Sequence, residues 1–337
     1  MTHKKVACYF IRMAVSGIFL LMLSLNASAK NILLTNDDGL TSNIVALYSA
    51  LKESGHDVIV SVPCQGQSGM GAAILFLKPI KPLPEACLGR AALSGDPGVG
   101  PVTKKDENFS YTDFYYVNGT PVMATSYGLD VLAPKRWGGA PDLVLSGPNE
   151  GRNTGPMINA SGTVSNVQFA AARGIPAIAL SAGMNTAGKE ESDGNIVNNP
   201  LSVVVAELSN TLVSHLEGSS DGDALLPESL ALNVNFPDDV SHDTAWQLTR
   251  IGTYNEYTLA FSEDLSQDSF ARSYGLAEQP YPGFTIAYNS TAPTQEQIDN
   301  EAYVAQNAIS VSVMQVSFGT EKAEHDWLRS RLSELLE

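Results

Sequence analysis

The stretch that decides the fold reads Ile32-Leu33-Leu34-Thr35-Asn36-Asp37-Asp38-Gly39. An apolar run ends abruptly in two adjacent carboxylates and a glycine. Such a run is typical of a strand that is buried on both faces of a parallel sheet. The carboxylates then lie at the carboxyl edge of that strand, where open α/β sheets place their ligands. We therefore expect an α/β fold with a polar site at this edge.

The adjacent carboxylates of Asp37 and Asp38 allow two interpretations. Neighbouring negative charges repel and are costly to desolvate, and a divalent cation would relieve both costs. Mg²⁺ and Mn²⁺ prefer oxygen ligands and often take only one or two carboxylates plus water. Gly39 permits the turn that brings both side chains to one ligand. The alternative is that Asp38 caps the following helix. One aspartate suffices for a cap, so the pair favours a metal site.

Residues 1–29 have the features of a secretory signal peptide. Three basic residues precede an apolar stretch (residues 13–25) that is too short to span a membrane comfortably. Ala27-Ser28-Ala29 then forms a small-residue cleavage signal. We predict cleavage after Ala29 and a periplasmic protein. The alternative is an uncleaved membrane anchor.

The remaining chain is strongly acidic. Cleavage removes three positive charges and no negative ones, which takes the formal net charge from −16 to −19. Such a chain repels nucleic-acid backbones and anionic membranes, so we expect neither as a partner of the mature protein. An anionic substrate would need a local cation in its binding site.

Cysteine and histidine usage argues against a zinc site. The mature chain keeps Cys64 and Cys87, and it contains no C-x-x-C motif. Its four histidines do not stand at the spacings of zinc ligands. Export would permit a disulfide between the two cysteines, but two free thiols fit the sequence equally well.

Strand and helix signals alternate through residues 30–200. This alternation predicts a doubly wound, Rossmann-like and mostly parallel sheet with helices on both faces. We expect strands at residues 31–35, 57–62, 114–117, 142–145 and 176–180, and helices at residues 41–54, 121–132 and 164–173. Residues 78–113 are rich in Pro, Gly and charge, which predicts a loop or short-strand insertion.

Residues 201–337 differ in character but are expected to complete the same single domain, which spans residues 30–337. We expect a polar loop at residues 183–199, helices at residues 201–216 and 321–336, and strands at residues 231–236, 246–251 and 308–316. Residues 252–300 are aromatic and polar with little periodicity. They predict hairpins, or an arm that reaches a neighbouring subunit, so the C-terminal part is a β-rich extension.

Two further loops follow strands of the predicted sheet at the same edge. Gln67-Ser68-Gly69 follows the second strand, and the hydroxyl of Ser68 suits a metal or a phosphate. The run from residue 146 to residue 155 follows the strand at residues 142–145. In this run Asn149 offers a neutral carbonyl oxygen and Asn153 an amide donor. Loops that converge on one sheet edge favour a binding site over separate turns.

Two other segments stand where a strand or loop enters a helix. Ser161-Gly162-Thr163 precedes the helix at residues 164–173, and helix N-termini bind phosphate readily. The alternative there is a plain helix cap. In Asn118-Gly119-Thr120-Pro121 the Thr120 hydroxyl could contact a ligand, but a cap with Pro in the first turn explains the segment and is favoured.

These segments, in this order and separation, resemble the SurE family of metal-dependent survival-protein nucleotidases. The family's N-D-D-G matches residues 36–39, its S-G matches residues 68–69, and its G-T-P matches residues 119–121. Its P-D-x-V-x-S-G-x-N-x-G-x-N-x-G matches residues 141–155, its S-G-T-V residues 161–164 and its G-x-P-A residues 174–177. The likeness is strong over residues 31–181 and faint beyond them.

The resemblance implies a phosphomonoesterase that acts on nucleoside monophosphates, first on 5′- and by extension on 3′-monophosphates. It places the ligands of one divalent ion, Mn²⁺ or Mg²⁺ with Ca²⁺ as an alternative, on Asp37, Asp38, Ser68 and Asn149. Substrate and phosphate contacts are expected from Asn36, Asn153, Ser161, Gly162 and Thr163. Family members often form dimers or tetramers that exchange a C-terminal arm, which implies a homodimer or homotetramer here.

The resulting hypothesis is hydrolysis by a metal-activated water that Asp38 orients or deprotonates. Tyr254 or Tyr257 would stack on the base of the substrate. Three rivals remain. A haloacid-dehalogenase-type phosphatase would need an aspartate where Asn36 stands, and a nucleoside hydrolase would carry more aspartates after the first strand. An exported binding protein would hold a nucleotide or metal without turnover.

Overall fold

A computed structural model describes residues 29–191, 194–220, 224–316 and 322–335. The predicted leader therefore lies outside the described residues, except for Ala29. The described residues form a nine-stranded sheet in the order β10-β13-β9-β6-β5-β1-β2-β4-β3. Among them, no helix is long and apolar enough to cross a membrane.

The centre of the sheet is parallel, as predicted. It contains β1 (Asn31–Thr35), β2 (Asp57–Pro63), β4 (Phe114–Val117), β5 (Leu143–Glu150), β6 (Ala177–Ala182) and β9 (Leu230–Asn235). An antiparallel pair occurs toward each end of the sheet. At one end β3 (Val99–Pro101) pairs with β4. At the other end β13 (Ile309–Gln315) pairs with β9, and β10 (Trp246–Thr249) runs parallel to β13.

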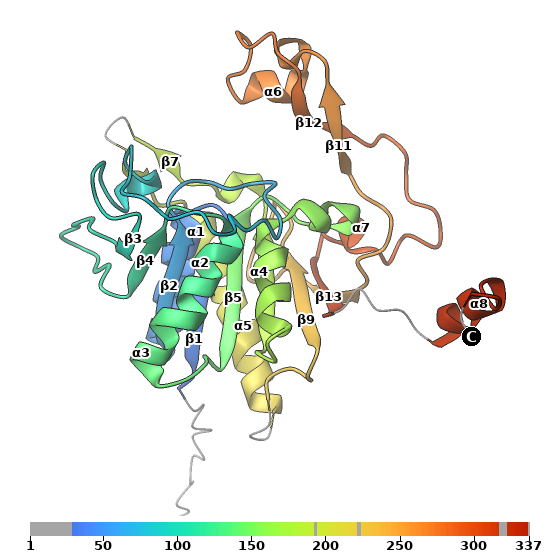
Figure 1. Cartoon of the computed structure of the whole chain (residues 1–337), viewed down its shortest axis with the longest axis horizontal. Coiled ribbons are helices and arrows are strands. Elements are labelled where there is room, and N and C mark those ends of the chain that lie inside the picture. Colours follow the sequence, from blue (N-terminus) through green and yellow to red (C-terminus); the bar gives the residue numbers. More distant parts are fainter. Residues whose placement is uncertain (1–28, 192–193, 221–223, 317–321, 336–337) are drawn as a thin grey trace, which may run out of the picture.

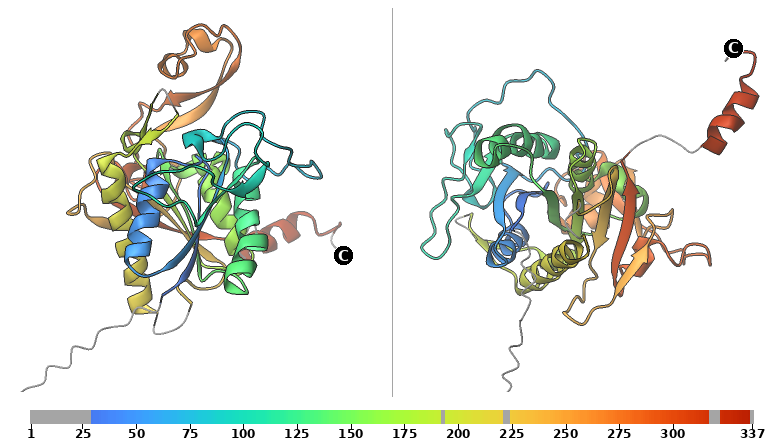
Figure 2. Two further views of the ribbon diagram at one scale, coloured as in Figure 1. Left: turned by 90° about the vertical axis from the view of Figure 1, so that its left-hand side faces the viewer. Right: turned by 90° about the horizontal axis from the view of Figure 1, so that it is seen from below.

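Helices cover both faces of the sheet (Figures 1 and 2). One face carries α1 (Ser42–Glu53) and α5 (Pro200–Ser219), and the other carries α2 (Pro121–Tyr127), α3 (Ala133–Trp137) and α4 (Gly162–Ala171). Side chains of β1 alternate between the two cores. Ile32 and Leu34 pack on the α1 side, and Leu33 packs on the α4 side. This two-sided burial is the physical reason for the apolar run, and it confirms the predicted fold class.

Two elements extend beyond their predicted ends. The helix predicted at residues 121–132 continues through a π-helical turn, η2 (Gly128–Leu132), into α3 and ends at the left-handed Gly138. Strand β5 continues past Pro148, although proline lacks an N–H for the sheet. The register with β6 shifts between Ser146 and Asn149, so the missing donor falls in the irregular part of the ladder.

Residues 252–300 form an arm that projects from the carboxyl edge of the sheet (Figure 1). Its antiparallel hairpin pairs β11 (Tyr257–Ser262) with β12 (Gly283–Tyr288). Its tip carries η5 (Leu265–Gln267) and α6 (Ser269–Ser273). The sequence predicted a hairpin arm here, but it missed the short helix α7 (Glu301–Val304) that follows. The closing helix α8 (Lys322–Arg331) lies within residues 321–336 as predicted, although residues 321 and 336 are outside the described part.

The remaining segments are short. The insertion at residues 78–113 contains η1 (Leu88–Arg90) and β3, and the predicted loop at residues 183–199 holds η4 (Met184–Thr186), β7 (Lys189–Glu190) and β8 (Ile196–Val197). Cys64, directly after β2, and Cys87 in the insertion form a disulfide, which decides the question that the sequence left open. The N–H of Leu88 also donates to the carbonyl of Cys64 at 2.8 Å. The insertion is therefore fixed to the sheet edge.

Candidate active site

The turn after β1 is closed by the side chain of Asn36. Its Oδ1 accepts from the N–H of Gly39 at 3.0 Å, and its Nδ2 donates to the Gly39 carbonyl at 2.8 Å. The backbone carbonyl of Asn36 accepts from Asn166 at 3.2 Å. Asn36 is fully buried, and its polar atoms are used within the turn. Asn36 thus shapes the turn that presents the two aspartates, and its predicted contact with substrate stays a prediction.

Asp37 points at the start of α4. The Thr163 hydroxyl donates to Asp37 Oδ1, and the carboxylate also accepts from the backbone N–H groups of Gly162 and Thr163. A Cβ on Gly162 would lie 2.7 Å from the Cβ of Asp37, so glycine permits this close approach. Asp37 is buried, and burial raises the pKa of its carboxyl despite these hydrogen bonds. The amides that the sequence assigned to phosphate thus bind Asp37 in this structure.

Asp38 faces the end of β5. Its Oδ2 accepts from the backbone N–H of Glu150 at 3.2 Å. Burial, followed by repulsion from Asp37 and Glu150, raises its pKa well above the ordinary value. The capping alternative does not apply, because α1 begins at Ser42 with Thr41 as its N-cap. Among the described residues, no ion pair neutralises either aspartate.

Ser68 and Asn149 reach the same place from different strands. The N–H of Gln67 donates to the backbone carbonyl of Asp37 at 2.7 Å, which ties the loop that carries Ser68 to the turn after β1. Asn149 Nδ2 donates to the carbonyl of Gly151 at 2.7 Å. The amide is thereby oriented, and its Oδ1 remains as the acceptor.

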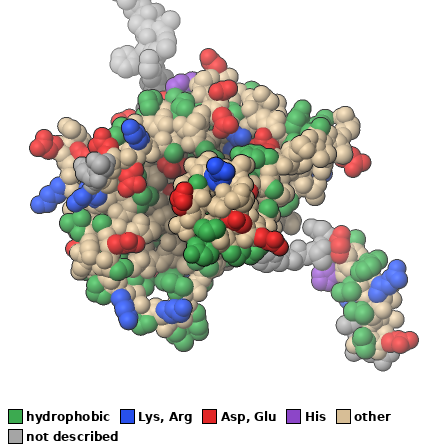
Figure 3. Space-filling model, turned by 90° about the horizontal axis from the view of Figure 1, so that it is seen from above, with side chains coloured by type: hydrophobic (Ala, Val, Ile, Leu, Met, Phe, Trp, Pro, Cys, Tyr) green, Lys and Arg blue, Asp and Glu red, His purple; other side chains and the backbone are tan. Residues whose placement is uncertain are grey.

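A cavity of about 500 Å³ opens at this edge of the sheet. Five predicted site residues line it, namely Asp37, Ser68, Asn149, Asn153 and Ser161. The other four, Asn36, Asp38, Gly162 and Thr163, lie outside its lining and contact the residues that form it. In a view from above, acidic and apolar side chains surround a hollow on this face (Figure 3). The convergence predicted from the sequence is therefore present.

The arm supplies an aromatic wall to this cavity. The wall consists of Tyr257, Leu259, Phe270, Tyr274, Ile286 and Tyr288. The rings of Phe270 and Tyr274 lie 4.8 Å apart. Sequence reasoning proposed Tyr257, which lines the cavity, and Tyr254, which is instead buried against Tyr303. The aromatic content of residues 252–300 was the available signal for the rest of the wall.

Arg152 lies in the loop after β5 and connects this loop to the base of the arm. The sequence did not single it out as a functional residue. Its guanidinium binds Asp238 at 2.9 Å and Glu256 at 3.1 Å. The Tyr257 hydroxyl donates to the backbone carbonyl of Arg152. Only 12% of the Arg152 side chain is exposed, and the pair with Glu256 is better shielded from solvent than the pair with Asp238, whose side chain is 58% exposed. The arginine lines the cavity, but its charge is balanced by two carboxylates. Its position as the single basic side chain in the matched run was the signal available.

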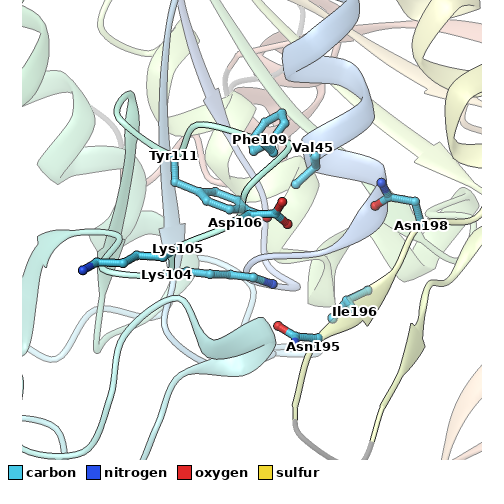
Figure 4. A pocket seen from close by; sticks show the side chains of 9 residues that line it. All are labelled: Val45, Lys104, Lys105, Asp106, Phe109, Tyr111, Asn195, Ile196 and Asn198. Carbon is cyan, nitrogen blue, oxygen red and sulfur yellow. The ribbon is translucent and has the colours of Figure 1, made fainter.

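A second cavity of about 310 Å³ lies between the insertion, α1 and the segment around β8 (Figure 4). Its described lining is Val45, Lys104, Lys105, Asp106, Phe109, Tyr111, Asn195, Ile196 and Asn198. This lining shares no residue with that of the first cavity and includes none of the predicted site residues.

The donors around Asp37 fit a hard divalent cation. Among the described residues no group of three or more His, Cys, Asp or Glu side chains is arranged to hold a metal. The oxygens available are two carboxylates, a serine hydroxyl and an amide carbonyl, which water would complete. This is the ligand chemistry of Mg²⁺, Mn²⁺ or Ca²⁺ rather than of zinc. The uncompensated charge of two desolvated aspartates supports the fit.

Comparison with known proteins agrees with this arrangement. The sequence model of the family described as "Survival protein SurE" matches residues 32–258. The chain belongs to the SurE family. The crystal structure of the SurE protein from Aquifex aeolicus aligns with a TM-score of 0.61 and 26% identity, covering 89% of this chain and 99% of that one. The predicted resemblance is therefore confirmed.

Individual relatives of this SurE-family chain are similar over parts of their length. An acid phosphatase from Yarrowia lipolytica is 34% identical and covers 62% of this chain, which spans 57% of that protein. A 5′-nucleotidase SurE from Caldanaerobacter subterraneus is 32% identical, over 62% of this chain and 66% of the relative. A 5′-nucleotidase SurE from Hyperthermus butylicus is 28% identical over 89% of both chains.

Proposed function

We propose that this chain is a divalent-metal-dependent phosphomonoesterase that hydrolyses nucleoside monophosphates. The observation that carries the proposal is the Asp37–Asp38 pair at the cavity edge. Two adjacent carboxylates are desolvated there without a paired cation among the described residues. The relatives described as 5′-nucleotidases and as an acid phosphatase support the same reaction class.

Asp37, Asp38, Ser68 and Asn149 would hold the cation. Once bound, the cation would attract the phosphate and lower the pKa of a water molecule. The residues of the chain have distinct tasks in this scheme. Thr163 fixes Asp37. Asp38 would orient or accept a proton from the attacking water through Oδ1, which has no hydrogen-bond partner among the described residues. Asn153 would donate to the phosphate. The reaction yields the nucleoside and inorganic phosphate.

The aromatic wall supports a nucleoside as the leaving group. Phe270, Tyr274 and Tyr288 face the cavity that Asp37 lines. A planar base can stack on such rings, whereas a small sugar phosphate leaves them exposed to water. The second candidate is a broad-specificity acid phosphatase, which the relative from Yarrowia lipolytica favours.

The deciding experiment is a phosphate-release panel on the purified chain. It compares nucleoside 5′- and 3′-monophosphates, an aryl phosphate and sugar phosphates, each with Mn²⁺, Mg²⁺, Ca²⁺ or a chelator. We expect metal-dependent release that is fastest from nucleotides. Equal release from all esters would favour the acid phosphatase, and nucleotide binding without release would favour the binding protein.

Matched variants connect the activity to the site. Asp37→Asn and Asp38→Asn should each lower metal-dependent kcat/KM by at least about a thousandfold. Each variant weakens a ligand of the cation, and Asp38→Asn also removes the carboxylate that would orient the attacking water. Asp130→Asn is the control, since Asp130 is 56% exposed and pairs with Arg173 on the outside of the helical layer. Full activity of Asp37→Asn would reject the site.

We further propose that the chain is exported and forms a homo-oligomer through its arm. The Ala27-Ser28-Ala29 signal and the Cys64–Cys87 disulfide support export to the periplasm. Phe261 and Phe284, which are 65% and 70% exposed on the hairpin, support association. Terminal sequencing after periplasmic extraction should give Lys30 first. Light scattering should give a dimer or tetramer that Phe261→Ser dissociates.

A further inference from the structure

Glu301 is a buried carboxylate that the proposed reaction does not use. It begins α7 and is fully shielded from solvent. Its Oε1 accepts from the backbone N–H of Gly155 at 2.9 Å, and its Oε2 accepts from Asn233 Nδ2 at 3.0 Å. The Ser312 hydroxyl donates to the same carboxylate. Within the described residues no cation pairs with it, so its burial is costly and needs a reason.

The groups that Glu301 binds converge on Asn153. Asn233 Nδ2, which donates to Glu301, also donates to the backbone carbonyl of Asn153 at 2.9 Å. The backbone N–H of Asn153 donates to Asn235 Oδ1 at 2.8 Å. Both sides of the Asn153 backbone are therefore held by asparagines of β9, and Gly155 is held directly by Glu301.

The side chain of Asn153 faces the other way, into the cavity. Its Nδ2 donates to the Ser181 hydroxyl at 2.9 Å and lies 3.5 Å from the Thr163 hydroxyl, which in turn binds Asp37. A series of hydrogen-bonded residues thus connects Glu301 of α7 with Asp37. Rotation of the Asn153 backbone would move the side-chain amide of Asn153 away from the cavity.

We propose that Glu301 is a positioning residue that holds Asn153 in the orientation needed to bind the phosphate of the substrate. This inference rests on the phosphomonoesterase activity proposed above. Glu301 acts through Asn233 and Gly155, and it does not touch the substrate. A negative acceptor suits this place, because charge-assisted hydrogen bonds are stronger than neutral ones and tolerate less rotation.

The same geometry makes the support sensitive to protonation of Glu301. Burial raises the pKa of its carboxyl to about 7. The groups that face it from β9, β13 and the 153–155 loop are an amide, a hydroxyl and a backbone N–H, all uncharged. The nearby Arg250 contributes its carbonyl to the Glu301 N–H, and its guanidinium binds Asp299 instead.

Asn233 offers a specific response to that protonation. Its Oδ1 is buried without a hydrogen-bond partner among the described residues. A protonated Glu301 becomes a donor, and a half-turn of the Asn233 amide would present Oδ1 to it. The same half-turn removes Nδ2 from the Asn153 carbonyl. Protonation therefore removes the hydrogen bond from Asn233 to the Asn153 carbonyl, while both carboxyl oxygens of Glu301 keep hydrogen-bond partners.

The test uses the full chain and compares Glu301→Gln with Glu217→Gln. Glu217 is a matched control, because it is also a buried carboxylate with a raised pKa but lies beside His56. We expect Glu301→Gln to raise KM for a nucleotide and the inhibition constant of inorganic phosphate by about tenfold, with a smaller change in kcat. Glu217→Gln should change neither constant.

A double-mutant cycle with Asn153→Ala separates positioning from general stability. If Glu301 acts through Asn153, Glu301→Gln should change KM by less than about twofold in the Asn153→Ala background. An unchanged tenfold effect in that background would overturn the proposal, and so would a lowered Tm with unaltered KM and phosphate inhibition.

Amide hydrogen exchange of the wild type tests the support of the Asn153 backbone without any variant or turnover. After correction for intrinsic rates, the Asn153 N–H, which donates to Asn235 Oδ1, should lose protection between pH 8 and pH 6 as Glu301 takes up a proton and Asn153 loosens. Constant protection would contradict the proposal even if the variants fail to fold. Failure of the wild type to release phosphate would reject the proposed function instead. The exchange measurement does not need turnover, so it would still test whether Glu301 supports Asn153.

Discussion

The hydroxyl of Thr163 donates a hydrogen bond to Oδ1 of Asp37, across 126 positions of sequence. The first turn of α4 therefore fixes the carboxylate that follows β1. Thr163 is fully buried and lies behind the cavity lining, so its effect on a ligand passes through Asp37. In the proposed metal site this is the role of an outer hydrogen bond that orients a ligand.

Replacing Thr163 with valine should weaken the site while preserving the packing volume. Loss of an outer hydrogen bond of this kind typically costs about 10–100-fold in metal affinity or activity. We expect that loss in kcat/KM, together with a higher Mn²⁺ concentration for half-maximal rate. Thr125→Val is the control, because Thr125 is equally buried but binds the Thr35 hydroxyl at 3.2 Å. Equal metal dependence of the two variants would refute this role of Thr163.

A methyl group at Gly162 should disrupt the contact between Asp37 and the first turn of α4 by a steric clash. Its Cβ would lie 2.7 Å from both the Cβ of Asp37 and the Cγ of Pro121. We expect Gly162→Ala to cost about 1–3 kcal/mol in the free energy of unfolding and more than tenfold in activity. Gly139→Ala has open space around it and should change neither. Urea denaturation and steady-state rates measure both effects, and a fully active Gly162→Ala would show that Asp37 need not sit against α4.

The central fold was predictable because local patterns reported it directly. The apolar run of β1 records burial on two faces, and Pro121 marks the start of the helical segment that was predicted at residues 121–132. The edge position of Ser68 and Asn149 followed from the geometry of parallel strands alone. Periodicity is a property of neighbouring residues, so it specifies strands and helices well.

The contacts made across long sequence separations were not predictable in this way. Arg152 meets Asp238 and Glu256, and Glu301 meets Gly155 from 146 positions away. No local pattern states which loops meet once the sheet is formed. The wall formed by Phe270 and Tyr274 depends likewise on how the arm folds back over the cavity. A single sequence gave the composition of the arm but not the surface that it presents.

The disulfide should contribute measurably to stability. Cys64 and Cys87 are 23 residues apart, and closing a loop of this size removes unfolded-chain entropy worth about 3 kcal/mol. Cys64→Ser should lower the free energy of unfolding by about that amount under oxidising conditions. A reductant should lower wild-type stability to the level of the variant and leave the variant unchanged. Equal stability of wild type with and without reductant would mean that the bond does not form in solution.

The raised pKa of Glu301 makes the stability of the fold depend on pH in a predictable direction. Its carboxyl titrates near 4.5 when exposed and at about 7 when folded, so the native state holds a proton that the unfolded chain has released. This contribution is complete below pH 4.5 and is lost as the pH rises to about 7. From pH 5 to pH 7.5, wild type should therefore lose roughly 2–3 kcal/mol relative to Glu301→Gln.

Urea denaturation at half-unit pH intervals measures this difference. The Glu301→Gln variant removes the titrating group but keeps an acceptor for the Gly155 N–H, so its own pH dependence reports all the other groups. The difference curve should flatten above pH 7.5, because Glu301 is then ionised in both states. A difference that is constant across this range would show that Glu301 ionises normally in the fold. Its hydrogen bonds to Gly155 and Asn233 would then outweigh the cost of burying its charge.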